Sequence, residues 1–210
     1  MKLKFFSVIR DVIREPTKFF TKAAKEKTFA NAFLFYLVFL AILNAFMLPY
    51  MLVALKPLLA MFGVQQLTVL VGIGYYLFAV ISGSIGVFIR TGINWVLLWL
   101  FKGKGNYIQT FNGLVYAYAP LLLFAPLYLL MPIALVPGRE WFMIVFVLLF
   151  LPAIIWLVWL QCTAMSIVHK ISKGYAFVAL FVVPMVVVLL LAFAFVMFLF
   201  LGLLVSSRAA

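Results

Sequence analysis

Residues 175–205 read YAFVALFVVPMVVVLLLAFAFVMFLFLGLLV, an apolar segment without a single charged side chain. As a helix rising about 1.5 Å per residue, this segment is longer than the roughly 30 Å hydrocarbon core of a bilayer. A helix satisfies its backbone hydrogen bonds internally, as the absence of water in lipid requires. The segment therefore predicts a membrane-spanning helix.

Four more apolar segments precede it, and short charged or turn-forming loops separate them. We expect spans at about Phe29–Leu55, Leu67–Phe101, Tyr107–Val136 and Trp141–Val168. Hydrophobic residues make up 69% of the 210 residues and charged residues only 10%, which is more apolar side chain than a soluble domain of this size can bury. The sequence therefore predicts an all-α membrane protein built as a five-helix transmembrane bundle.

The domain organisation follows from these spans. We expect residues 1–28 to form a basic cytoplasmic segment, residues 29–205 the five-span domain, and residues 206–210 a short outer tail. Residues 3–14 carry apolar side chains at helical spacing on one face and basic or polar side chains on the other. This pattern predicts an amphipathic helix lying in the headgroup layer, and the alternative is a helix packed on the protein's own loops. The expected lipid anchors are Phe5, Ile9 and Val12.

Basic residues are distributed unevenly between the two sides that five spans define. The 16 Lys and Arg against 4 Asp and Glu give a net charge of +12. Twelve of the 16 fall in residues 1–28 and in the loops near Lys102 and His169, which share one side, whereas three fall on the other side. Because basic loops stay in the cytoplasm, the bias predicts a cytoplasmic N-terminus and an outer C-terminus.

The position of this charge also indicates its partner. Basic side chains that lead into a membrane span favour the lipid bilayer and its anionic headgroups, and disfavour nucleic acid. A protein partner or a second copy of the chain is compatible with the same surface. Candidate contacts for a headgroup or a protein partner are Arg14, Lys18, Lys22, Lys25, Lys27, Lys102, Lys104, Lys170 and Lys173.

Groups that carry catalysis are nearly missing from the predicted spans. All four acids lie outside them, so the spans offer no carboxylate for a proton relay. His169 is the only histidine and Cys162 the only cysteine, which excludes a zinc-protease motif and a multi-thiolate zinc site. We therefore expect no enzyme, no cofactor and no metal site, and we expect His169 to contact headgroups or loop residues.

Arg90 lies within the overlong second segment, where a lone cation is costly. Either the span covers about residues 67–89 and Arg90 marks its inner end, or it covers about residues 82–101 and Arg90 is deep. The preferred interpretation is an interfacial arginine whose side chain reaches the headgroups. The alternative is a polar groove for a transporter, flippase or channel with a small or anionic lipid-like substrate. Its candidate residues are Arg90, Asn94, Tyr116, Tyr118 and Gln161.

Residues 101–120 read FKGKGNYIQTFNGLVYAYAP, and this segment resembles the Ypt-interacting-protein (Yip) family of small five-span membrane proteins. The family has a loop with glycine and lysine, followed by a helix like the one at residues 116–120. Residues 14–20, REPTKFF, and residues 169–176, HKISKGYA, with Pro184 beyond, are similar to its entry segment and its last inner loop. The resemblance implies five spans, an inner N-terminus and a link to vesicle traffic, GTPase binding and membrane shaping.

Together these features predict a non-enzymatic integral membrane protein of Yip type. We expect it to organise membrane, or to recruit partners or trafficking factors, through the basic cytoplasmic side.

Overall fold

The computed structural model describes residues 5–209, with side chains up to Leu199. Every regular element in that range is helical, and five segments are long and apolar enough to cross a membrane. In chain order these are α3 (Ala30–Met61), η1 and α4 (Gln65–Leu67, Thr68–Leu100), α5, α6 and η2 (Tyr107–Tyr116, Leu121–Phe124, Ala125–Leu135), α7 (Phe142–His169), and α8, η3 and α9 (Lys173–Phe177, Val178–Val182, Val183–Ala209). The predicted all-α, five-span architecture is confirmed.

Several helix ends differ from the expected ones. The first span was expected to stop at Leu55, before Lys56 and Pro57, but α3 continues through both to Met61. α9 reaches Ala209, so residues 206–209 of the expected tail are helical, and residue 210 lies outside the described residues. A proline removes one helical hydrogen bond, but the neighbouring turns can carry the helix past it.

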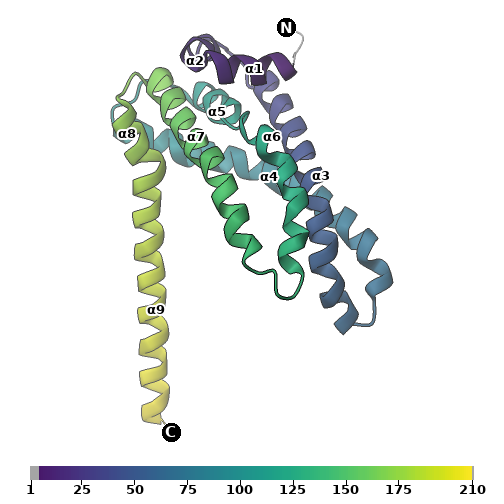
Figure 1. The fold of residues 1–210 in the computed structure, drawn as a ribbon. Coiled ribbons are helices and arrows are strands. Elements are labelled where there is room, and N and C mark those ends of the chain that lie inside the picture. The colour runs from purple at the N-terminus through teal and green to yellow at the C-terminus, as the bar shows by residue number, and fades with distance from the viewer. Residues whose placement is uncertain (1–4, 210) are drawn as a thin grey trace.

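α4 is one unbroken helix of 33 residues. At 1.5 Å per residue this is about 50 Å, well beyond a hydrocarbon core of about 30 Å. Figure 1 shows how the length is accommodated, because α4 runs obliquely behind α6 and α7 instead of parallel to them. The tilt brings the C-terminal half of α4, including Arg90, against the rest of the bundle.

The third span is broken where its prolines fall. α5 ends at Tyr116, a turn leads through Pro120 into the short α6, and the 3₁₀ segment η2 contains Pro126 and Pro132. Proline cannot donate the backbone hydrogen bond that an α-helix needs. All residues from Thr110 to Ala117 are buried, so α5 lies at the centre of the fold.

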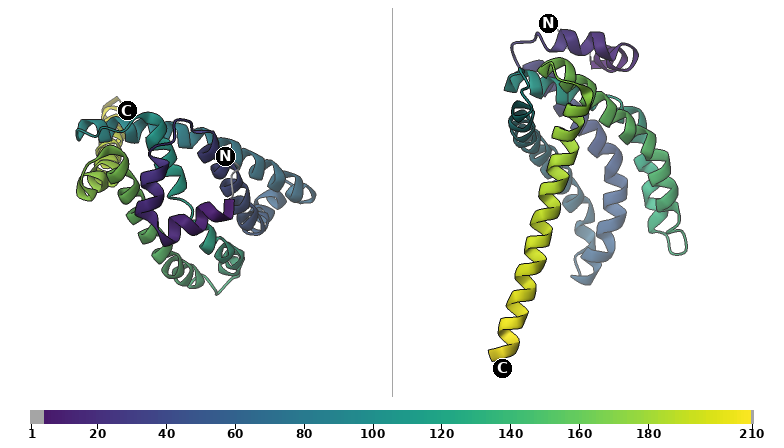
Figure 2. Two further views of the ribbon diagram at one scale, coloured as in Figure 1. Left: turned by 90° about the horizontal axis from the view of Figure 1, so that it is seen from above. Right: turned by 90° about the vertical axis from the view of Figure 1, so that its left-hand side faces the viewer.

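The two amphipathic helices α1 (Phe5–Arg14) and α2 (Pro16–Ala23) lie across one end of the bundle (Figures 1 and 2). α1 confirms the predicted helix, although residues 3 and 4 lie outside the described residues. Its apolar face contacts protein: Val12 is fully buried, and the Phe5 ring lies 5.0 Å from that of Phe35. For these side chains the alternative interpretation, packing on the protein itself, is the correct one. An amphipathic face suits both environments equally.

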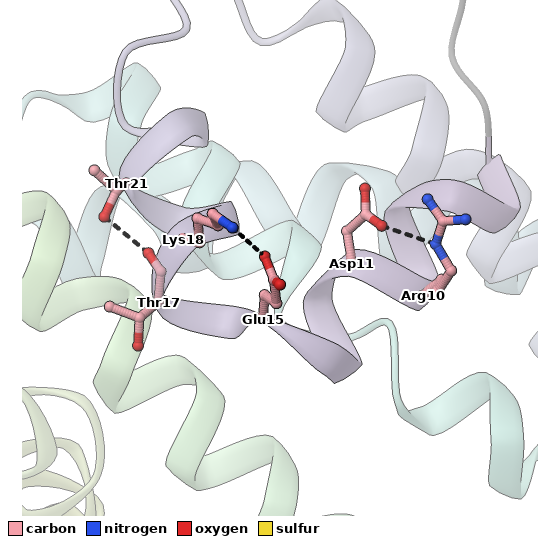
Figure 3. A network of polar contacts seen from close by, with 6 residues as sticks. All are labelled: Arg10, Asp11, Glu15, Thr17, Lys18 and Thr21. Atoms are coloured by element: carbon pink, nitrogen blue, oxygen red, sulfur yellow. Dashed lines mark hydrogen bonds and ion pairs between the residues drawn. The ribbon is translucent and has the colours of Figure 1, made fainter.

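The outward face of α1 and α2 carries the polar side chains drawn in Figure 3, together with Phe6, which is 82% exposed. Arg10 pairs with Asp11 at 3.0 Å and Lys18 with Glu15 at 2.9 Å, and the Thr21 hydroxyl donates to the Thr17 carbonyl at 2.8 Å. Both ion pairs are exposed and join near neighbours in the sequence, so they add little to stability.

α9 stands apart from the other helices (Figures 1 and 2). Every side chain from Met185 to Leu199 is exposed. It follows the π-helical turn η3, which precedes Pro184 and accommodates the proline's missing N–H. A surface so apolar on all sides requires lipid or another apolar molecule around it.

Candidate functional site

Arg90 extends from α4 into the bundle and bonds to two neutral groups. Its guanidinium donates to the Tyr118 hydroxyl and, at 3.0 Å, to Oε1 of Gln161 on α7. The Tyr118 ring is held by two rings of α3, with centroid distances of 5.7 Å to Tyr36 and 5.5 Å to Phe39. Four segments that are distant in sequence therefore converge on one cation.

Arg90 lies well inside α4, on an unbroken stretch of helix. α4 is continuous, and Arg90 lies ten residues before its end at Leu100, which is about 15 Å along the axis. Gln161 lies eight residues before the end of α7, or about 12 Å. The guanidinium is directed at Tyr118 and Gln161, two protein contacts that the preferred interpretation of an arginine reaching the headgroups does not include.

The positive charge of Arg90 is not matched by a negative one. Among the residues that the structure describes, the ion pairs join Arg10 to Asp11 and Lys18 to Glu15. A desolvated cation without a counter-charge is costly, and neutral acceptors offset only part of the cost.

Two amide groups near Arg90 also have unsatisfied donors. Gln161 is fully buried and Asn94 is 4% exposed, and neither Nε2 of Gln161 nor Nδ2 of Asn94 has a hydrogen-bond partner. Asn94 lies one turn from Arg90 on the buried face of α4. An unpaired buried donor costs about 1–3 kcal/mol.

Four of the five residues expected in a polar groove therefore lie in one region. Arg90, Tyr118 and Gln161 are in direct contact, and Asn94 is one helical turn away. Tyr116 is separate, because it belongs to the last turn of α5 and contacts the N-terminal segment. Sequence spacing cannot show this, since the chain turns between residues 116 and 118.

The N-terminal segment is attached to α5 through a row of polar side chains. Nε2 of Gln109 donates to the Ala24 carbonyl at 2.7 Å, and Nδ2 of Asn112 donates to the Thr28 carbonyl at 3.1 Å. Both residues lie on one face of α5, three positions apart. This attachment was not predicted from the sequence, although polar residues at helical spacing on a buried helix are its signal.

Tyr116 continues the same row one turn later. Its hydroxyl donates to Oε2 of Glu26 at 3.4 Å, which is a weak hydrogen bond. Burial raises the pKa of the Glu26 carboxyl, against smaller opposing effects of the Tyr116 hydrogen bond and the Lys22 charge. Glu26 therefore holds its proton to a higher pH than a carboxyl in water.

α4 and α7 end in the same way, each with a lysine in the left-handed conformation. Lys102 has a φ of 62° and Lys170 a φ of 56°. In each case the next backbone N–H closes the last helical turn: Gly103 donates to the Leu98 carbonyl at 2.9 Å, and Ile171 donates to the Ser166 carbonyl at 3.2 Å. Both helices thus place a basic side chain at the negative end of the helix dipole.

His169 joins these two helix ends from inside the protein. It is fully buried, so the expected headgroup contact is wrong, whereas the alternative, a contact with loop residues, describes it. Its Nε2 lies 2.8 Å from the Thr110 hydroxyl, which itself donates to the Asn106 carbonyl. Nε2 of His169 is therefore the donor. The Lys104 N–H donates to the His169 carbonyl at 2.9 Å, which fixes one loop to the other.

The glycines of the segment KGKG explain why this loop can lie so close to His169. A Cβ at Gly103 would meet His169 Nδ1 at 2.5 Å and the Leu98 carbonyl oxygen at 2.7 Å. A Cβ at Gly105 would meet Val168 Cγ1 at 2.7 Å. These distances are shorter than carbon contacts allow, so both positions require glycine for close approach.

The expected basic contacts lie together at the end of the bundle that α1 and α2 cover (Figure 1). All nine are exposed, and they come from three segments: the N-terminal helices with their linker, the loop after α4, and the loop after α7. We call this surface the basic face; it consists of Arg14, Lys18, Lys22, Lys25, Lys27, Lys102, Lys104, Lys170 and Lys173.

Comparison with known proteins identifies the family. A family model described as the Yip1 domain matches residues 10–206. Neither the search of curated proteins nor the search of solved structures gave a match. The matched range includes the second half of α1, all five candidate spans and the loops that carry the basic face. The chain therefore belongs to the Yip1-domain family and is an integral, multi-pass membrane protein.

Proposed function

We propose that this protein is a non-enzymatic membrane organiser that gathers anionic lipids and acidic trafficking factors through the basic face, with the N-terminus in the cytoplasm and the C-terminus outside. The observation that carries the proposal is the arrangement of that face. Nine exposed basic side chains come from three segments, and hydrogen bonds hold those segments together.

This attachment makes the charge array preorganised. The loop after α4 is bonded to the end of α7 through Lys104, and the linker at residues 24–28 is bonded to α5. A fixed array loses less conformational entropy on binding than a disordered basic tail does. Each basic residue near an anionic membrane surface contributes about 1 kcal/mol of attraction.

The opposite end of the bundle provides a contrast within the same molecule. Lys56 and Arg139 are exposed there, and Glu140 lies next to Arg139. The difference in charge between the two ends favours placing the basic face on the cytoplasmic side.

Energy transfer from tryptophan to dansyl-labelled lipid tests the lipid part of the proposal. The protein is reconstituted in phosphatidylcholine vesicles with a trace of dansyl-phosphatidylserine or dansyl-phosphatidylcholine. Trp95 and Trp99 lie in the last turns of α4, near the basic face. If dansyl-phosphatidylserine gathers at this face, the efficiency of energy transfer from these tryptophans to its dansyl group rises. We expect a preference for phosphatidylserine that weakens at high salt.

Two matched variants locate the effect. Replacing Lys22, Lys25 and Lys27 by Gln should remove most of the preference, whereas replacing Lys56 and Arg139 by Gln should leave it. For the protein partner, fluorescent polyglutamate is titrated onto the same vesicles without anionic lipid, and its anisotropy is measured. Equal transfer to both lipids together with no binding of polyglutamate would refute the proposal.

A further inference from the structure

The unmatched charge of Arg90 points to a ligand. An arginine has five N–H donors and no acceptor, and the contacts to Tyr118 and Gln161 use two of the five. Both partners are neutral, so the net charge of the region stays positive. Any species that completes the site must bring a negative charge.

The groups around Arg90 offer further donors to such a species. Because Oε1 of Gln161 accepts from Arg90, the amide orientation is fixed, and Nε2 remains a buried donor without a partner. The Tyr118 hydroxyl accepts from Arg90 and keeps its own hydrogen available. Asn94 supplies another unpaired buried donor one turn along α4. These groups form a set of donors around one cation.

This chemistry suits a phosphate group better than a carboxylate or a halide. A guanidinium binds phosphate through parallel hydrogen bonds, and phosphate oxygens can accept further bonds from amide and hydroxyl donors. We propose that Arg90, Gln161 and Tyr118, with Asn94, form an intramembrane binding site for one phosphate group, carried by a lipid headgroup or by free phosphate.

The depth of the site is compatible with either source. Arg90 and Gln161 lie about 12–15 Å from the ends of their helices at the basic face. Arg90 and Tyr118 are partly exposed, whereas Gln161 is fully buried. A phosphate can therefore approach Arg90 from outside the protein, whereas Nε2 of Gln161 has no accessible surface and becomes available only when the side chains around it move. The site does not depend on the basic face or on its proposed role.

Native mass spectrometry of the protein in detergent tests the proposal with three probes. Dioctanoyl phosphatidic acid carries the phosphate on short tails, dioctanoylglycerol has the same tails without it, and inorganic phosphate has no tails. Binding of phosphatidic acid alone assigns a lipid headgroup, and binding of inorganic phosphate as well assigns a site for phosphate itself. Binding of neither probe, or equal binding of dioctanoylglycerol, overturns the proposal.

Two variants assign the binding to this site. Arg90→Gln keeps a polar side chain but removes the charge, and we expect at least a tenfold loss of phosphate affinity. Arg139→Gln, an exposed arginine at the opposite end, is the matched control and should bind as wild type does. Unchanged affinity in Arg90→Gln overturns the proposal.

A third variant separates ligand binding from a purely structural role. Gln161→Glu places a carboxylate about where Oε1 now lies, 3.0 Å from the guanidinium, so the protein supplies the counter-charge itself. We expect it to fold and to melt no lower than wild type, yet to lose phosphate binding. A folded Gln161→Glu protein that still binds phosphate with wild-type affinity would show that the ligand sits elsewhere. If the variant fails to fold, Arg90→Gln alone decides the proposal, with folding checked by its melting temperature.

Discussion

Gly105 offers a sharp test of how the loop after α4 is held against α7. In Gly105→Ala, the added Cβ would lie 2.7 Å from Val168 Cγ1 and 3.0 Å from two atoms of the His169 ring. Neither neighbour can yield easily, because Val is branched at Cβ and the His169 ring is bonded to Thr110. Overpacking of this kind costs about 1–3 kcal/mol, which for a chain of this size lowers the melting temperature by about 2–12 °C.

Two other glycines provide graded controls. At Gly113 the added Cβ would clash with the terminal methyl of Met165 at 2.6 Å, which a flexible side chain can move, and its other neighbours lie at an ordinary 3.5 Å. At Gly86, on α4, nothing lies within 4 Å, so alanine should be neutral or stabilise the helix by up to about 1 kcal/mol. The melting temperature should therefore be highest for Gly86→Ala, lower for Gly113→Ala and lowest for Gly105→Ala.

The assay is thermal unfolding in detergent, followed by intrinsic fluorescence. A double variant, Gly105→Ala with Val168→Ala, removes the closest clashing atom. Its loss of melting temperature should be smaller than the sum of the losses in the two single variants. If Gly105→Ala melts like Gly86→Ala, or if the double variant shows no such coupling, the close approach of this loop to α7 is not what requires the glycine.

Three further predictions concern charge. Arg90→Leu removes the hydrogen bonds to Tyr118 and Gln161 but also removes an unmatched cation, so the two effects oppose each other and the free energy of unfolding should change by less than about 1 kcal/mol in chemical denaturation; a loss of about 3 kcal/mol would mean that the hydrogen bonds outweigh the cost of the unmatched charge. The pKa of Glu26 is raised in the folded protein, so the folded state holds more protons than the unfolded one just above the ordinary carboxyl pKa. The free energy of unfolding should therefore fall as the pH rises through the folded pKa. In Glu26→Gln, the plot of melting temperature against pH should be flatter over this range. When an impermeant maleimide is added to intact cells, the Lys56→Cys variant should be labelled and the Lys104→Cys variant should be labelled only after the cells are opened. The reverse pattern would invert the proposed topology.

The five spans could be predicted from the sequence because each depends only on its own composition. Length and hydropathy suffice to show that a segment such as residues 175–205 belongs in lipid. The ends were less certain, as at Lys56 and Pro57, because a helix can continue past a proline when its neighbouring turns hold it. The basic face was also accessible from the sequence, since its residues lie in loops between predicted spans.

For the Arg90 region, the residue types could be predicted from the sequence, but their contacts could not. The sequence shows a cation without an acid in the spans, but not that Tyr118 and Gln161 turn towards it, because that depends on how three segments pack. The same limit applies to α1, whose apolar face fits lipid or protein equally well. It also applies to His169, whose loop-like sequence context conceals a buried position at the end of α7.

The isolation of α9 has a consequence for how the protein is made. Every side chain from Met185 to Leu199 is exposed, so the packed centre around α5 uses only segments that are synthesised earlier. Domains fold from the N-terminal side during synthesis, and the centre can therefore assemble while α9 is still being translated. α9 then enters the bilayer on its own hydrophobicity, and the exposed stretch from Met185 to Leu199 is constrained by its surroundings and not by the packed centre.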